Sequence, residues 1–542
     1  MLERMPMTHT RSTIWLSMIT VIACGAASFA QNVQRFHVFE YTLISTNSYS
    51  NKFKDVTLTV DVTTPSGVKT VRGFYDGDGS GGQSGNVWKF RFMPSALGSH
   101  SWVSSSSDGQ LNNKSGSFTC VTSSSSNIYL KHGPIRIHPT NPHAIAHQDG
   151  TPFFWNGESE HFFLTHVSSK ISQSQRKAAL DFLQSKKVNN MVMTMVNRDD
   201  GYYVFPWTGT SSPDHNNFDL SRLRDWEEIL IYARDRGIVT DLWFYSDDSG
   251  GFYPGALGAA EDMYFQYMIA RLAAYANVTW NLALEYGEYR SASWVTNRAQ
   301  FFKNECPYNS FLSVHDTPDD TWDFEGNPHL DHTSLQRFTT HNTLNAVVID
   351  NRIRTANAGR PIPICHEEHS YEGSINGNKD VLRRDSWAIT CAGGFYKAGT
   401  LGFWIGTPYS SAQHFDEVKI LYETVTQTTW WEMGPRNDLI SSGGNGRFCL
   451  AKVAGASSEF LIYSVSSSSF TLDLSGISGT FTTDWVNPIT GAKSTGSIPG
   501  GAVRTLTNPF GSGDAAVRIH GESDSTPPTT VPADRNDEGP LW

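Results

Sequence analysis

The stretch that follows residue 30 alternates apolar and polar positions at the spacing of β-strands. Alternating runs such as VTLTVDVTT (56–64) and NVWKFRFMP (86–94) are separated by turns rich in glycine, proline and serine. A period of two places one face of each strand against a core, and many short strands with turns between them are typical of a small sandwich. The pattern therefore predicts a β-sandwich over residues 31–125, ending in a serine tract.

Between residues 126 and 432 mainly apolar runs of strand length alternate with helical segments. NNMVMTMV (189–196) is a run of the first kind, and LSRLRDWEEILIYARDRG (220–237) of the second. Buried strands separated by helices indicate a parallel sheet covered by helices. About 300 residues in this style favour an eight-stranded (β/α)8 TIM barrel. A doubly wound open sheet is the alternative, but no GxGxxG motif follows a strand, so we expect no dinucleotide site and no cofactor.

Short strands rich in serine and glycine return over residues 433–520 and predict a second β-sandwich. Residues 521–542 are acidic and rich in proline, with too little apolar surface to form a core, so a disordered tail is expected. The chain is therefore predicted to be a multidomain protein in which β-sandwiches flank a TIM barrel on both sides.

Residues 1–30 resemble an export signal. Arg4 and Arg11 precede the apolar run IWLSMITVIACGA (14–26), which is short for a membrane span, and small residues precede a cleavage point before Gln31. We therefore expect a secreted or periplasmic protein with no membrane span. The alternative at this end is a lipid anchor on Cys24.

The composition of the chain argues against some classes of binding partner. The net charge is −11 and no dense run of lysine and arginine occurs, which argues against nucleic acid and against anionic membranes. Aromatic residues make up 12% of the chain, and aromatic faces stack on sugar rings as well as filling cores. The pattern carries no signal for the oligomeric state.

Metal and disulfide sites lack support. After the signal peptide five cysteines remain, an odd number without a CxxC pair, so neither a disulfide scaffold nor a zinc ribbon is indicated. In CHEEHSYEG (365–373), His366 and His369 are three residues apart, whereas the helical HExxH motif of zinc proteases places its histidines four apart. We therefore expect no metal, and a zinc protease is a minor alternative.

Two apolar strands of the central region end on carboxylates. VTWNLALEYGEY (278–289) leads to Glu285, and PIPIC (361–365) leads to Glu367 and Glu368. The chemistry of a (β/α) barrel sits at the carboxyl ends of its strands, and glycoside hydrolysis needs one protonated and one ionised carboxyl group. The alternative is that these side chains cap the helices or turns that follow.

Motifs along the chain resemble those of a group of secreted bacterial glycosidases. The N-terminal region looks like their immunoglobulin-like domain, most of the central region resembles their apiosidase-like barrel, and the C-terminal region resembles the small collagen-binding β-domain that closes the same architecture. The motifs that carry this resemblance, in chain order, are GFYDGDG (73–79), FRFMP (90–94), GSHSW (98–102), GPIR (133–136), PFFW (152–155), EHSYE (368–372) and WVNPITG (485–491).

The resemblance implies catalytic roles. It places a general acid/base on the fourth barrel strand, at Glu285, and a nucleophile on the seventh, at Glu368. Successive strand side chains point to opposite faces, so we expect Glu367 to lie in the wall and only Glu368 to be catalytic. Two positions depart from the family pattern: Leu284 stands where many relatives have asparagine, and Glu158 lies where they have aspartate.

Other polar and aromatic residues at predicted strand ends are candidates for substrate binding, with helix capping or core packing as the alternative for each. They are Glu158, Asp199, Trp280, His315, Tyr371, Glu372 and Trp404. We expect His366 and His369 to orient carboxylates or touch substrate.

The resulting prediction is a glycoside hydrolase that cleaves a plant or algal cell-wall polysaccharide or oligosaccharide by a retaining two-carboxylate mechanism. The alternative is a secreted surface protein that binds carbohydrate or collagen without catalysis.

Overall fold

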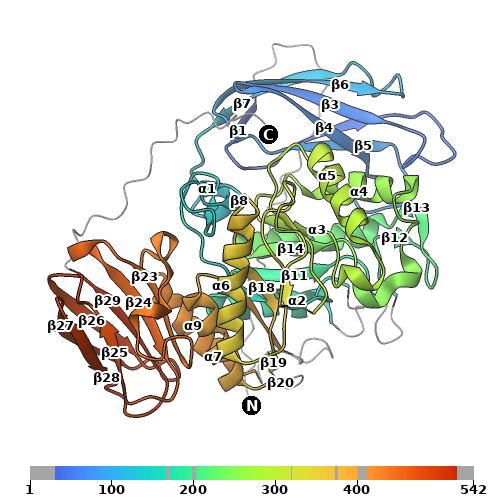
Figure 1. Cartoon of the computed structure of the whole chain (residues 1–542). Coiled ribbons are helices and arrows are strands. Elements are labelled where there is room, and N and C mark those ends of the chain that lie inside the picture. The colour runs from blue at the N-terminus through green and yellow to red at the C-terminus, as the bar shows by residue number, and fades with distance from the viewer. Residues whose placement is uncertain are drawn as a thin grey trace, which may run out of the picture.

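The computed structural model describes residues 31–165, 171–197, 203–318, 320–372, 376–400 and 412–521. The predicted signal peptide with Cys24 and the predicted tail from residue 522 onward lie outside the described residues. Figure 1 shows a β-rich N-terminal part at the top, a central part of strands and helices, and a β-rich C-terminal part at the lower left.

The N-terminal part is a seven-stranded sheet in the order β1-β7-β6-β3-β4-β5-β2. β1 pairs with β7 in parallel, and the other neighbours are antiparallel. In β3, Leu58, Val60 and Val62 are buried while the residues between them are more exposed, as the alternation predicts. The strands are β1 Gln31–Gln34, β2 Phe39–Ile44, β3 Leu58–Thr64, β4 Gly67–Tyr75, β5 Val87–Phe92, β6 Gly98–Ser106 and β7 Ser115–Val121.

The central part is built on eight strands in the order β16-β15-β14-β11-β10-β21-β18-β17. All neighbouring pairs along this path are parallel. In chain order the path runs from the fifth strand back to the first and then from the eighth to the sixth, which is the order around a (β/α)8 barrel. The strands are β10 Asn156–Glu158, β11 Asn190–Thr194, β14 Val239–Trp243, β15 Val278–Asn281, β16 Leu312–Ser313, β17 Leu335–Gln336, β18 Cys365–Glu368 and β21 Phe395–Thr400.

Helices separate most successive strands, with none between β16 and β17 in the described residues, and they cover the outer side of the strands (Figure 1). Several begin at a side-chain cap: Ser172 and Gln175 form a capping box at α2, and Asp219 caps α3. The helices are α2 Gln173–Ser185, α3 Leu220–Asp235, α4 Ala259–Leu272, α5 Ala292–Glu305, α6 His341–Asn357, α7 Lys379–Cys391 and α9 His414–Val425. The predicted TIM-barrel-like architecture is therefore present.

A buried charge network fastens the N-terminal sheet to the barrel helices. Arg91 of β5 donates to Glu227 of α3 at 2.6 Å, and Arg271 of α4 donates to Asp76 at 2.8 Å and to Glu227 at 2.7 Å. Burial by itself raises the pKa of Glu227, but the two guanidinium groups lower it to about 2, so the carboxylate stays ionised.

The C-terminal part contains a six-stranded antiparallel sheet in the order β22-β23-β24-β29-β26-β27 and a separate pair, β25-β28. Apolar residues from both sheets form one core, which includes Phe460, Leu472 and Ile519. The strands are β22 Gly434–Pro435, β23 Arg447–Lys452, β24 Glu459–Ser464, β25 Ser469–Asp473, β26 Thr480–Val486, β27 Lys493–Pro499, β28 Val503–Thr507 and β29 Ala515–His520.

Helix α7 holds this C-terminal part against the barrel. Arg383 donates to Asp514 at 2.9 Å, and Arg384 donates to the same carboxylate at 2.9 Å. Tyr463 adds a third hydrogen bond to Asp514 at 2.9 Å. Both arginines therefore serve the contact between barrel and C-terminal sheet.

Short elements join the larger ones. They are α1 Ile128–His132, β8 Ile135–Ile137, β9 Ile145–His147, β12 Trp207–Thr208, β13 Asp214–Phe218, η2 Asp247–Phe252, η3 Tyr286–Glu288, β19 Tyr371–Glu372, β20 Asn376–Gly377, η5 Trp430–Glu432, η6 Asn437–Leu439 and η7 Gly455–Ser457. Within the described ranges no helix is long and apolar enough to cross a bilayer. The five cysteines in these ranges are buried and unbridged.

Candidate active site

Glu368 ends strand β18 and is held by side chains from other strand ends. His161, three residues after β10, brings its Nε2 to 2.8 Å from Oε1 of Glu368. Gln336, the last residue of β17, donates from Nε2 to Oε2 at 2.6 Å. Tyr371 also hydrogen-bonds the carboxylate, and its hydroxyl lies 3.4 Å from Oγ of Ser159. These contacts fix the Glu368 carboxylate with only 5% of the residue exposed.

Glu285 follows β15 and is partly exposed. Its backbone is left-handed, with φ 41° and ψ 53°, an uncommon conformation for a residue with a side chain. The Glu285 backbone N–H donates to Nδ1 of His315 at 3.2 Å, which helps to hold this conformation. Strain of this kind collects at functional sites, where the surrounding structure enforces it.

The two carboxyl groups differ in their proton affinity. Burial, then the charge of Glu368 and then that of Asp247, raises the pKa of Glu285 to about 8. Burial also raises the pKa of Glu368, but the charge and hydrogen bond of His161, aided by Tyr371, lower it to about 2. Near neutral pH Glu285 is therefore mainly protonated and Glu368 ionised, which is the division that assigns one acid and one nucleophile or base.

Two further carboxylates lie beside Glu285. One carboxylate oxygen each from Asp247, Glu285 and Glu288 lies within 4.8 Å of the others. Like charges that close favour the protonated form of one member. The trio therefore supports the raised pKa of Glu285, and its members are half-buried or exposed, so the group is reached from solvent.

His315, which follows β16, contributes a buried imidazole to the same site. Its ring lies 5.1 Å from that of Trp243, and burial lowers its pKa to about 3, so the ring is neutral. Because Nδ1 accepts from the backbone of Glu285, the proton is on Nε2, which has no hydrogen-bond partner among the described residues. A neutral N–H donor is thus available to a ligand.

Glu367 lies inside the barrel, which corrects its predicted place in the wall. Its carboxylate forms an ion pair with Lys397 of β21, and Lys397 also lies 2.7 Å from Asp241 of β14. All three side chains are almost fully buried. Burial raises the pKa of Glu367 to about 8 even though Lys397 opposes the shift. Glu367 thus has its partners inside the barrel, whereas Glu368 contacts His161 and Gln336 at the strand ends.

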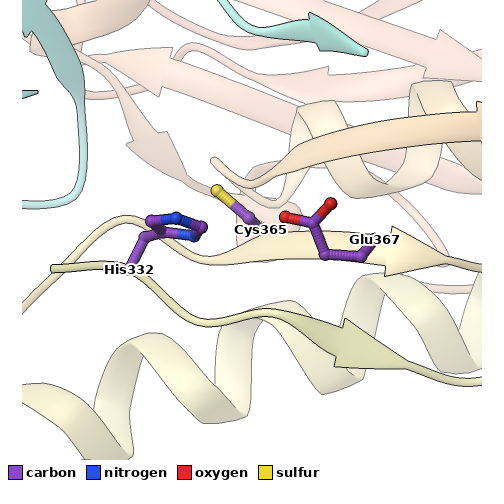
Figure 2. Close-up of side chains that lie close together, drawn as sticks. All are labelled: His332, Cys365 and Glu367. Carbon is purple, nitrogen blue, oxygen red and sulfur yellow. The ribbon is translucent and has the colours of Figure 1, made fainter. Parts of the chain in front are cut away.

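A second group in the interior has the residue types of a metal site. Figure 2 shows His332, Cys365 and Glu367 close together, and one ligand atom of each lies within 4.8 Å of the others. This donor set fits a metal poorly, because Glu367 already contacts Lys397 and burial raises the pKa values of both Glu367 and the Cys365 thiol. A divalent ion would have to displace an ammonium group and take the thiol proton in a buried space.

The two histidines of CHEEHSYEG have different surroundings. His369 lies 3.2 Å from the hydroxyl of Ser370 and 3.6 Å from Asp385 of α7, so it is oriented by the helix layer. His366 is fully buried, and neither ring nitrogen has a hydrogen-bond partner in the described part of the chain. Burial lowers its pKa well below the usual value, so the ring is neutral.

Glu158 and Glu372 meet at His414, the first residue of α9. Nδ1 of His414 lies 2.7 Å from Glu372 and Nε2 lies 3.4 Å from Glu158. Burial opposes protonation, but hydrogen bonds to both carboxylates raise the pKa of His414 to about 9. Glu372 also accepts from the backbone N–H groups of Gln413 and His414. These two predicted substrate ligands thus brace the start of α9.

Trp280 does not face the site, which corrects its predicted contact with substrate. It is fully buried, and its ring packs 5.2 Å from Phe244 and 5.4 Å from Phe302 of α5. On β15, side chains alternate between the interior and the helix layer, and Trp280 points to the helices. The other two predicted contacts, Asp199 and Trp404, lie outside the described residues.

Three residues of this site were missed from the sequence: His161, Gln336 and Lys397. The role of Lys397 could have been predicted, because a lysine within the apolar strand sequence FYKAGT needs a buried partner of opposite charge. His161 and Gln336 carried none, since their roles come from the register that brings β10 and β17 beside β18.

Comparisons with known proteins agree with this architecture. The family model described as Domain of unknown function (DUF5060) matches residues 32–107. A comparison with curated protein sequences finds no match.

Solved structures resemble most of the chain. A candidate glycoside hydrolase from Bacteroides vulgatus superposes with a TM-score of 0.72 at 18% identity, covering 90% of this chain and 99% of that one. A structure described as a glycoside hydrolase gives 0.60 at 16% identity, with 72% and 97% covered. A family 5 glycoside hydrolase from Bacteroides vulgatus gives 0.58 at 16% identity, with 72% and 93% covered. At these identities the likeness establishes a shared fold.

Proposed function

We propose that this chain is a glycoside hydrolase with Glu285 as general acid/base and Glu368 as nucleophile. The observation that carries the proposal is the placement of two carboxyl groups at the ends of the fourth and seventh barrel strands in opposite surroundings. Glu285 lies beside Asp247 and Glu288, and its pKa is raised to about 8. Glu368 is held by His161 and Gln336, and its pKa is lowered to about 2. Barrel enzymes place their chemistry at this end of the strands. The fold shared with glycoside hydrolase structures supports the same conclusion.

In the first step, Glu285 gives its proton to the glycosidic oxygen while the Glu368 carboxylate attacks the anomeric carbon. The bond between that carbon and the leaving oxygen breaks, and a glycosyl ester with Glu368 forms. His161 and Gln336 keep Glu368 ionised and oriented for the attack. The leaving group departs as an alcohol.

In the second step, the Glu285 carboxylate takes a proton from water, and the water oxygen attacks the same carbon. The ester bond to Glu368 breaks, so the sugar leaves with the configuration it had in the substrate, and Glu285 is again protonated. We propose this retaining course. It requires carboxyl groups about 5 Å apart, whereas inversion requires roughly 6.5 to 9.5 Å.

The proposed substrate is a plant or algal cell-wall polysaccharide or oligosaccharide, as the family resemblance implies. The neutral N–H donor of His315 and the hydroxyl of Tyr371 are proposed sugar contacts, because both lie beside the catalytic carboxylates. Further proposed sugar contacts are Asp199, Trp404, Glu158 and Glu372. The last two are less favoured because both already bind His414.

We further propose that the N-terminal sheet is an immunoglobulin-like sandwich and the C-terminal sheets a second sandwich of the kind associated with collagen binding. The proposed boundaries are 31–125, 126–432 and 433–520. Secretion, with a free or a lipid-anchored N-terminus, completes this proposal.

The test replaces each carboxylate by its amide. Glu368→Gln removes the nucleophile, and Glu285→Gln removes the acid/base, whose contribution in such reactions is about 100- to 10,000-fold. Both variants are assayed on plant and algal glycans that the wild-type protein degrades, with Glu228→Gln, an exposed residue of α3, as the matched control. Normal hydrolysis by either stable variant would show that the assignment is wrong.

A further inference from the structure

Gln336 lies between the two catalytic carboxylates. It is the last residue of β17, and a register shift between Leu335 and Gln336 sets it opposite Glu368 of β18. Its Nε2 donates to Oε2 of Glu368 at 2.6 Å, and its side chain also hydrogen-bonds that of Glu285. One amide group thus contacts a carboxyl group from the fourth strand and one from the seventh.

The orientation of this amide follows from its neighbours. An ionised Glu368 only accepts hydrogen bonds, so the NH2 group of Gln336 must face it. The carbonyl Oε1 is then directed elsewhere, and it is buried without a hydrogen-bond partner among the described residues. Because 95% of the surface of Gln336 is buried, an unsatisfied carbonyl there is costly unless a ligand supplies a donor.

The residue before Glu285 leaves a sugar contact to be made by another side chain. Leu284 stands directly before the acid/base, so this position cannot hydrogen-bond a sugar hydroxyl. Gln336 approaches the same carboxylates from β17 and presents a free acceptor. An amide is suited to this place because it does not ionise, and so it can contact an acid and a carboxylate without adding charge.

We propose that Gln336 is the positioning residue of this site: its NH2 group links Glu285 to Glu368, and its Oε1 accepts a hydrogen bond from a hydroxyl of the sugar bound beside them. The proposal rests on the proposed two-carboxylate function. It assigns to β17 the hydroxyl contact that the residue before the acid/base does not make.

The test compares Gln336→Met, which keeps the length of the side chain and removes its hydrogen bonds, with wild-type protein. Gln266→Met is the matched control, because Gln266 of α4 also donates to a carboxylate, that of Glu305, at 3.1 Å. The full-length protein is labelled with 13C at the glutamate side-chain carboxyl, and the signals of Glu285 and Glu368 are assigned with their glutamine variants. No substrate is needed for this titration.

Loss of a donor to an ionised carboxylate destabilises the charged form, so both carboxyl pKa values rise in Gln336→Met. The expected shift is about one to two pH units for Glu368, and the control leaves both values in place. Unchanged pKa values of both groups in Gln336→Met overturn the proposal. If Glu285 and Glu368 of the wild-type protein have the same pKa, the proposed two-carboxylate function fails. The pKa change caused by Gln336→Met still decides the role of Gln336 in that case.

The carbonyl contact has a separate readout. With an aryl glycoside that the wild-type protein hydrolyses, Gln336→Met raises KM as well as lowering kcat, and Gln336→Glu does not restore either, because a third carboxylate adds charge between Glu285 and Glu368. A variant that keeps the wild-type KM and kcat would contradict the hydroxyl contact.

Discussion

Replacing His414 by glutamine tests the charge assignment at the edge of the site. His414 is fully buried between Glu158 and Glu372, and its pKa is raised from 6.5 to about 9. A group whose pKa is higher in the folded than in the unfolded state contributes stability that is complete below the unfolded value and is lost as the pH rises through the folded value. The stabilisation by His414 is therefore complete below pH 6.5 and lost by about pH 9.

The magnitude follows from the pKa difference. About 2.5 pH units at about 1.4 kcal/mol each give roughly 3 to 4 kcal/mol. Between pH 6 and pH 9 the wild-type protein should lose this amount more than His414→Gln does. At pH 6 the variant is the less stable protein, because Glu158 and Glu372 keep their charges without a partner.

Calorimetric unfolding of both proteins at pH 6 and pH 9 measures the difference. The matched control is His143→Gln: burial lowers the pKa of His143 to about 4, so its ring is neutral in the folded protein at both pH values. Nδ1 of its ring lies 2.9 Å from the main-chain carbonyl of Ile362. Equal losses of stability in wild type and His414→Gln would refute the protonated state of His414.

Two further substitutions probe the environment of the nucleophile and the barrel interior. His161→Gln removes the charge and the hydrogen bond that lower the pKa of Glu368 to about 2. The loss of kcat/KM at acidic pH, which this pKa sets, should therefore move up by about one pH unit. An unchanged acidic pH dependence would contradict the role of His161. Lys397→Met leaves Asp241 buried without its cation, and we expect urea denaturation to show a free energy of unfolding lower by about 3–5 kcal/mol. The control Lys419→Met, on the surface of α9, changes this free energy by less than about 1 kcal/mol. Equal losses of stability in the two variants would contradict the account.

The barrel was predictable because its strands are buried on both sides. In β11, Asn190–Thr194, every residue is buried, and a continuous buried run of this length is what a parallel sheet requires. The carboxylates at the ends of the fourth and seventh strands were predictable for a related reason, since the strands carry them to the same end of the barrel.

The contacts across the strands were not predictable. Trp280 and Glu285 occur in one sequence run, yet Trp280 packs under α5 while Glu285 leaves the strand in a left-handed turn. A register shift sets the place of Gln336, and the place of Glu367 depends on its ion pair with Lys397 of the neighbouring strand β21. Alternation predicts that Glu367 and Glu368 face opposite ways, but it does not predict that both find partners on other barrel strands.

The most direct test of the central claim is the mass of the protein after reaction with a 2-deoxy-2-fluoro aryl glycoside of the sugar that it releases. The fluorine slows both steps, whereas the good leaving group speeds only the first, so a glycosyl-enzyme accumulates. The account predicts one added sugar, located by peptide mapping on Glu368 and lost in Glu368→Gln. A label on another residue, or no label together with a product of inverted configuration, would contradict it.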